Sequence, residues 1–169
     1  SKSLIIKVIP STRKPLIDTK NVIPTGPIIS TNEGKKAQNR TYQDLLKNKN
    51  DEFNFEQLAT SELIQITVSG EQSKWLPADM YTRIDFSPDG AYVLVGTIQK
   101  PFSYIVTYGR FPNTTRIHAK DGRLVKEISK VPLIEDLPKG FMSARKGNRS
   151  FTWRADKPAS LVYASVLDE

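Results

Sequence analysis

The sequence has no cysteine and a single histidine, His118, among its 169 residues. Without cysteine the chain forms no disulfide bond, uses no thiolate nucleophile and holds no zinc through sulfur. One histidine by itself falls short of the ligand set of a transition metal, so we expect neither a metal nor a cofactor. To act as a catalytic base, His118 would need an activated serine and an orienting acid beside it. The flanking sequence, TRIHAK, supplies neither, and we expect a structural or exposed histidine.

Long hydrophobic runs are also missing. No apolar run approaches the ~20 residues of a membrane helix, and the run at residues 4–9 is too short for a signal peptide and lacks a small-residue cleavage site. We therefore expect a soluble chain with no membrane partner, whose compartment the composition leaves open. A strand that begins almost at the first residue is typical of a fragment of a longer protein.

Positive charge is in excess, because 25 lysines and arginines face 18 acidic residues and give a net charge of +7. Part of this excess lies in residues 145–158, RKGNRSFTWRADKP. Such a stretch fits three uses: a grip on nucleic acid, a contact with an acidic substrate, or a solvated rim. Charge alone does not separate them.

Periodicity in the second half of the chain favours β-strands. Residues 61–68 alternate, with Ile64, Ile66 and Val68 on one face, and residues 91–98 are apolar on both faces and should be buried on both. The SPDG segment that ends at Gly90 is a turn signal, because proline and glycine preset its backbone angles. The pair Asp121-Gly122 between two strands predicts a hairpin.

The first half reads as a long insertion over residues 10–60. Proline, glycine and polar residues remove all periodicity from residues 10–40. Thr41 precedes Asp44 by three residues, as in a capping box, and this pattern predicts one short helix over residues 42–48. We expect the insertion to be a loop with this helix as its only regular element.

Two segments resemble each other: DFSPDGAYVLVGTI and TWRADKPASLVYASV. Each has an aromatic strand end, a turn with proline and an apolar strand, and such repetition favours the blades of a β-propeller over a β-sandwich. Residues 81–128 then supply one complete four-stranded blade, and residues 148–169 supply half a blade. With a blade that lacks its first strand before them, residues 1–169 are an all-β partial propeller of about two to two and a half blades. A propeller needs more blades to close, so the chain reads as a fragment.

Several long stretches resemble one family, the glutamyl endopeptidases of the prolyl oligopeptidase group. The resemblance runs from about residue 9 to the end, through NVIPTGPIISTNEGKKAQNRTYQDLLKNKNDEFNFEQLATSELIQI, FSPDGAYVLVGTIQKPFSYIV, GRFP, VPLIEDLP and SARKGNRSFTWRADKPASLVY. Thr107 departs from it, since members of the family often carry proline there. Members are chloroplast enzymes in plants, and similar proteins occur in the cytoplasm or periplasm of bacteria.

The resemblance implies a propeller followed by an α/β-hydrolase domain whose Ser-Asp-His triad includes a G-x-S-x-G nucleophile elbow. This sequence has no G-x-S-x-G, so no residue in it is assigned a catalytic role and the chain alone is not expected to be an enzyme. The parent protein would be a serine peptidase. This segment would gate the active site and select peptide substrates, with the hydrolase domain as its partner.

Within the basic stretch, we single out Arg145, Arg149 and Arg154, together with Lys146, as candidate substrate-binding residues. An endopeptidase that prefers glutamate has to neutralise a carboxylate, and the planar guanidinium of arginine binds both carboxylate oxygens. The alternative is a solvated loop in which most charges do little. Nucleic-acid binding is disfavoured, because the propeller repeat already explains the aromatic residues as core.

Two further features remain open. Asp51, Glu52 and Glu56 form an acidic cluster without the spacing of a calcium loop, and a solvated helix end is expected. The open strand edges of a partial propeller are templates for pairing, so we expect the isolated chain to self-associate. A stand-alone interaction module that uses these edges is the alternative function.

Overall fold

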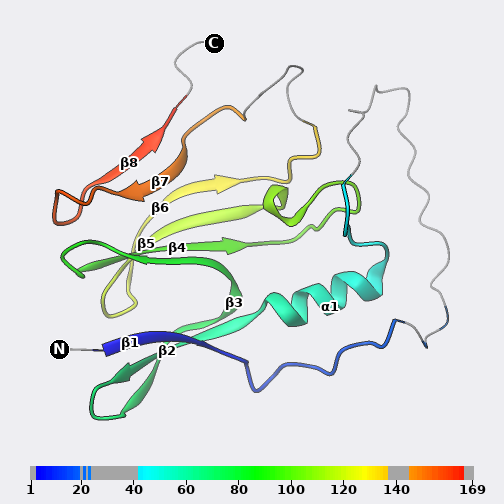
Figure 1. The fold of residues 1–169 in the computed structure, drawn as a ribbon, viewed down its shortest axis with the longest axis horizontal. Helices are drawn as coiled ribbons and strands as arrows, with labels where there is room; N and C mark the ends of the chain where they lie inside the picture. Colours follow the sequence, from blue (N-terminus) through cyan, green and yellow to red (C-terminus); the bar gives the residue numbers. More distant parts are fainter. Residues whose placement is uncertain (1–2, 20, 22, 24–41, 137–144, 166–169) are drawn as a thin grey trace.

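The computed structural model describes residues 3–19, 21, 23, 42–136 and 145–165. Over these residues the chain is mostly β, with a six-stranded antiparallel sheet in the order β1 to β6 and a separate two-stranded sheet of β7 and β8. In Figure 1 the strands succeed one another from β1 and β2 at the bottom to β7 and β8 at the top. The elements are β1 (Ser3–Val8), α1 (Lys49–Ala59), β2 (Ser61–Thr67), β3 (Gln72–Phe86), β4 (Tyr92–Ile98), the 3-10 helix η1 (Tyr108–Arg110), β5 (Asn113–Ala119), β6 (Leu124–Val131), β7 (Arg149–Trp153) and β8 (Leu161–Ala164).

The prediction of a mainly β chain with one short α-helix is confirmed. In place of separate four-stranded blades, however, the structure has one continuous sheet, because β3 (Gln72–Phe86) runs across residue 81, where the complete blade was predicted to begin. The first half of β3 pairs with β2 and the second half with β4, and the register shifts between Tyr81 and Arg83. Tyr81 donates a hydrogen bond from its hydroxyl to the carbonyl of Pro77, 2.6 Å away, across the segment where β3 changes partner and curves (Figure 1).

The two halves of the six-stranded sheet pack on each other through a hydrophobic core. Leu63 and Trp75 come from the β2 side of this sheet, Val93 and Val95 from β4, and Tyr81 lies between them. Burying an aliphatic side chain of this size stabilises the fold by about 1.5–3 kcal/mol. Leu63 is fully buried, and it lies on the opposite face of β2 from Ile64 and Ile66, with which it alternates along the strand. Ile5 of the edge strand β1, which pairs with β2, packs against this core.

The β7–β8 hairpin packs on the other face of β3. The indole Nε1 of Trp153 donates to the carbonyl of Asp85 at 2.9 Å, and the guanidinium of Arg83 donates to the carbonyl of Phe151. Arg83 lies opposite Gly96, so its side chain leaves the sheet on the face away from the core described above. The two segments that resemble each other in sequence are thus both hairpins, and one is stacked on the other.

Strand β4 and both predicted turns agree with the structure. Residues 93–98 are all buried, as a strand that is apolar on both faces should be. Gly90 closes its turn with a φ of 69°, and Gly122 closes the β5–β6 hairpin with a φ of 89°. Both values lie in the left-handed region, which glycine adopts without steric cost.

The predicted helix over residues 42–48 was wrong in position. Helix α1 begins at Lys49, with Asn48 as the N-cap residue, whose side chain accepts from the backbone N–H of Asp51 at 3.0 Å. Asp51 in turn accepts from the backbone N–H of Lys47 at 2.8 Å. A polar side chain caps the helix, as predicted, but this residue is Asn48, assisted by Asp51, rather than Thr41. Thr41 lies outside the described residues. None of the described helices is long and apolar enough to cross a membrane.

Candidate functional site

The first part of the basic stretch is a turn held together by its own arginine. The guanidinium of Arg145 donates to the carbonyl of Lys146 at 3.1 Å and to that of Asn148 at 2.7 Å, and Gly147 has a φ of 88°. Lys146 itself is exposed. Carbonyl partners satisfy the hydrogen-bond donors of Arg145 without neutralising its charge, so the turn presents a positive field to its surroundings.

Arg154 is neutralised within its own turn. Its Nε and Nη2 atoms donate to the two carboxylate oxygens of Asp156, at 2.9 and 2.5 Å. This hydrogen-bonded pairing lowers the pKa of Asp156. Because Asp156 already occupies the bidentate hydrogen-bonding edge of Arg154, fewer guanidinium donors remain for a substrate carboxylate.

Arg149 differs from Arg145 and Arg154 in that part of its side chain is buried without a hydrogen-bond partner among the described residues. It is half-buried at the start of β7, opposite Ala164, and its Nη1 atom is buried with no hydrogen-bond partner among the described residues. A buried donor without an acceptor costs roughly 1–3 kcal/mol, and more when it is charged. The backbone is irregular here, since Ser150 has a φ of 56° and the register shifts between Arg149 and Thr152. Of the three candidate arginines, Arg149 alone has a buried side-chain donor that lacks an acceptor in the described structure.

The structure does not bring Arg149 and Arg154 to one point. Arg149 opens β7 and Arg154 directly follows the end of this strand. Arg154 is bound to Asp156, whereas Arg149 has a buried donor without an acceptor among the described residues, so the predicted set divides into separate environments.

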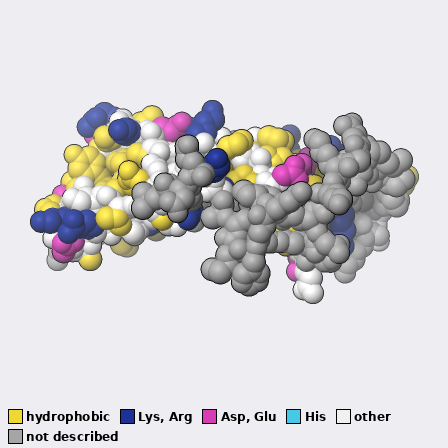
Figure 2. Space-filling model, turned by 90° about the horizontal axis from the view of Figure 1, so that it is seen from above, with side chains coloured by type: hydrophobic (Ala, Val, Ile, Leu, Met, Phe, Trp, Pro, Cys, Tyr) yellow, Lys and Arg dark blue, Asp and Glu magenta, His cyan; other side chains and the backbone are white. Residues whose placement is uncertain are grey.

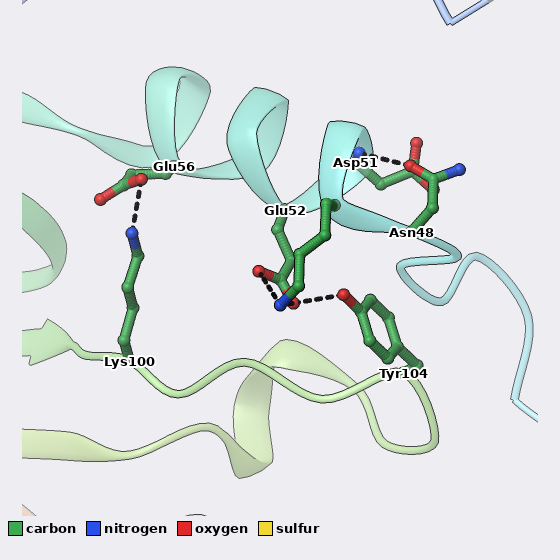
Figure 3. Close-up of polar contacts among 7 residues, drawn as sticks. Asn48, Asp51, Glu52, Glu56, Lys100 and Tyr104 are labelled. Carbon is green, nitrogen blue, oxygen red and sulfur yellow. Dashed lines mark hydrogen bonds and ion pairs between the residues drawn. The ribbon is translucent and has the colours of Figure 1, made fainter. Parts of the chain in front are cut away.

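The acidic cluster on α1 binds this helix to the loop that follows β4 (Figure 3). Glu56 accepts from the ammonium group of Lys100 at 2.7 Å, and Glu52 accepts from the hydroxyl of Tyr104 at 2.5 Å. Lys49, one turn earlier on the same helix, donates to both carboxylate oxygens of Glu52 at 3.0 and 3.1 Å. The expectation of a solvated helix end was therefore wrong for Glu52 and Glu56. Sequence gave no signal for their partners, because these lie more than forty residues away.

Electrostatics at this contact favour the ionised carboxylate. Burial raises the pKa of Glu52, but the hydrogen bonds from Tyr104 and Lys49 and the positive charges of Lys49 and Lys100 outweigh it, so the net pKa is lowered. Tyr104 has a raised pKa, from burial and from its bond to this carboxylate. Both directions describe a structural contact, in which the tyrosine remains a donor and the glutamate an acceptor.

His118 is buried and structural. Its Nδ1 atom donates to the carbonyl of Gly122 at 2.8 Å, and its ring lies 6.0 Å from the ring of Trp75. Neither contact supplies a nucleophile or an orienting acid. Within the described residues, no three histidine or acidic side chains converge as a metal-ligand group.

Comparison with known proteins relates the chain to one class of enzyme. Over nearly its whole length, the chain is homologous to a short segment of chloroplastic glutamyl endopeptidases. The resemblance noted in the sequence is thereby confirmed. No family model matches the sequence, and no solved structure matches it.

Two plant proteins carry this relationship. The chain is 42% identical over 150 residues to the "Probable glutamyl endopeptidase, chloroplastic" of Oryza sativa subsp. japonica, an alignment that covers 88% of this chain and 16% of that protein. It is 40% identical over 163 residues to the protein of the same description from Arabidopsis thaliana, covering 95% of this chain and 17% of that protein. The chain therefore spans only about a sixth of the length of these relatives, as the 16% and 17% coverages state.

Proposed function

We propose that this chain is a non-catalytic propeller segment of a glutamyl-endopeptidase-like serine peptidase, in which it gates access and selects peptide substrates. The observation that carries the proposal is the identity of 40–42% along nearly the whole chain to a segment of the chloroplastic relatives. An alignment of this length and identity indicates a shared fold and a shared place in the parent protein. The catalytic residues lie elsewhere in that parent.

The stacking of the sheets supports the propeller part of the proposal. The β2 side of the large sheet packs on one face of the β3–β4 pair, and the β7–β8 hairpin contacts β3 on the other face. Successive antiparallel sheets that stack face to face around an axis are the arrangement of propeller blades. Strand β8 of the last hairpin is open to solvent: Val162 and Tyr163, whose side chains point to opposite faces of the strand, are 42% and 54% exposed. Figure 2 shows hydrophobic side chains gathered at this end of the molecule, with lysines and arginines around them. A following blade would cover such a face.

Arg149 is the residue that we propose for contact with the substrate carboxylate. Its buried Nη1 atom lacks an acceptor among the described residues, whereas Arg154 is bound to Asp156 and Arg145 to carbonyls of its own turn. A buried guanidinium gains most from a carboxylate, because the pair replaces an unsatisfied donor with a charge-assisted hydrogen bond.

The first experiment is to read the gene on both sides of this segment. The proposal requires a downstream domain with a G-x-S-x-G elbow and later aspartate and histidine residues. In the protein that this frame encodes, Arg149→Gln should lower kcat/KM for peptides cut after glutamate by roughly a hundredfold relative to the matched glutamine peptides.

Arg154→Gln is the matched control, because this arginine is already paired with Asp156. It should leave the ratio of glutamate to glutamine cleavage unchanged. Equal losses in both variants, or a frame without a hydrolase domain, would remove the support for this function.

The alternative is a stand-alone interaction module that pairs through its sheet edges. The observation that favours it is that β1 and β6 both lie at the edge of the six-stranded sheet. Edge strands present unpaired N–H and C=O groups to any extended chain. A frame that stops close to the end of this segment would select this alternative.

A further inference from the structure

A groove lies between the edge strand β6 and the turn that Arg145 holds. It has a volume of about 550 Å³, within the range of peptide and small-ligand sites. Its apolar lining comes from Ile128, Val131, Pro132 and Ile134. This groove is separate from Arg149, which does not line it.

The rim of the groove is basic and its charges are not neutralised. Lys130, Arg145 and Lys146 line it, with Asp136 as the one acidic residue among the described lining. None of these three cations forms an ion pair within the described part of the chain, where the donors of Arg145 meet only carbonyl groups. Unpaired positive charge around an apolar floor attracts a partner that is apolar and negatively charged.

The adjoining strand edge is regular from Ser129 to Val131, directly after the register shift at Ile128. Residues 129–131 of β6 pair with residues 113–115 of β5 without a shift, and both irregularities of this ladder lie earlier in β6. Bulges protect the earlier part of the edge against pairing, whereas the last residues present an extended backbone beside the groove. An added strand would place alternate side chains into the groove and away from it.

We propose that this surface binds an extended acidic peptide segment, with an aliphatic side chain over Ile128 and Ile134 and flanking carboxylates on Lys130, Arg145 and Lys146. A second copy of the chain does not fit, because two β6 edges would bring their lysines together. Single-stranded nucleic acid fits poorly, because the described lining offers no aromatic ring on which a base can stack. The inference is independent of any peptidase activity.

The test is fluorescence polarisation with the 169-residue chain and a labelled peptide in which a leucine is flanked by glutamates. The double variant Lys130→Glu, Lys146→Glu should bind at least about tenfold more weakly. Lys126→Glu is the matched control: it changes the same charge on the same strand, but Lys126 lies opposite Ile117 and therefore on the other face from Lys130. The control should stay within about twofold of the parent.

Two further measurements identify the molecule that binds in the groove. Replacing the glutamates of the peptide by glutamines should weaken binding as much as the double variant does, and amide exchange at residues 128–132 should slow when the acidic peptide binds. The proposal is overturned if the double variant binds normally, if Lys126→Glu loses as much affinity, or if an oligonucleotide of equal charge competes equally well. Dimerisation through this edge that Lys130→Glu alters would assign the groove to a second copy and would also overturn it.

Discussion

At the scale of single residues, two glycines show how a turn signal and a tertiary contact combine. Gly90 and Gly122 both have positive φ, but only Gly122 is closely packed. A Cβ atom on Gly122 would lie 2.7 Å from the carbonyl oxygen of Trp75, while one on Gly90 would meet nothing within 4 Å. Trp75 also donates from its indole to the carbonyl of Lys120 at 2.9 Å, so the β5–β6 turn is fixed against β3 from two sides.

Gly122→Ala should therefore destabilise the chain more than Gly90→Ala. The left-handed backbone costs an alanine about 1–2 kcal/mol at either position, and the clash with Trp75 adds roughly another 1–2 kcal/mol at Gly122. Urea unfolding followed by circular dichroism measures both variants. Equal shifts in their midpoints would mean that the turn moves away from Trp75 without cost.

Glu52 gives a prediction with a defined pH dependence. Its folded-state pKa lies below the ordinary value of 4.5, so its contribution to stability is complete above pH 4.5 and is lost as the pH falls through the lower folded value. The contact is partly solvated, and we expect Glu52→Gln to cost about 0.5–1 kcal/mol at pH 7. The difference from the parent chain should shrink as the pH approaches 3. If the difference in unfolding free energy between the parent and Glu52→Gln were the same at pH 7 and pH 3, the ionised carboxylate would not be the cause of the destabilisation.

At the scale of elements, α1 depends on the loop and sheet end against which it packs. A helix of 11 residues does not persist alone, and no residue of α1 is fully buried. Its anchor is Phe55, whose ring contacts Phe102 and Phe111 edge to face, with centroid distances of 5.1 and 5.8 Å. The Glu52 and Glu56 contacts flank this anchor on the same helix.

Phe55→Ala should release α1 from the sheet. We expect a loss of about 2–4 kcal/mol, because the aromatic contacts and the buried ring area disappear together. Amide exchange should accelerate over residues 49–59 more than in β4 and β5. Leu58→Ala is the control, since Leu58 is 62% exposed on the same helix and should change stability by less than about 0.5 kcal/mol. Uniform acceleration across the whole chain would instead make α1 part of one cooperative unit with the sheet.

At the scale of the whole molecule, the two edges of the six-stranded sheet differ. Strand β6 carries exposed lysines and two register shifts, both of which oppose pairing with another copy. Strand β1 has one lysine, and the ammonium group of Lys7 donates inward to the carbonyl of Tyr81 at 2.6 Å. Leu4 is 70% exposed on this edge strand. Strand β1 is therefore the edge that is less protected against pairing with another copy of the chain.

We expect the isolated chain to self-associate through β1 at high micromolar concentration. Leu4→Lys should shift it toward the monomer in sedimentation velocity, because a charge at this position has to be buried or repelled when two edges meet. Ile105→Lys is the control, as Ile105 is 51% exposed on a loop away from this edge. A strict monomer for the parent chain, or equal effects of both substitutions, would exclude association through β1.

The sequence by itself determined the features that depend on neighbouring residues. Proline and glycine at fixed positions set the turns at Gly90 and Gly122, and the apolar run of β4 required burial on both faces. The repeat of two hairpins and the relationship to glutamyl endopeptidases were likewise legible, because both consist of residue order alone.

Only the tertiary structure decided which side chains meet. Cap residues recur along a polar chain, and in the structure α1 begins after Asn48 and packs through Phe55 on Phe102. The three arginines looked alike in sequence, yet Arg154 is bound to Asp156, Arg145 binds carbonyls of its own turn, and Arg149 has a buried donor with no acceptor among the residues that the structure describes. These differences in hydrogen-bond partners depend on contacts between distant segments or on local bends of the backbone. The periodicity of the sequence predicts neither. The physical reason is that the free energy of a charge depends on its partners and burial, which exist only once the chain has folded.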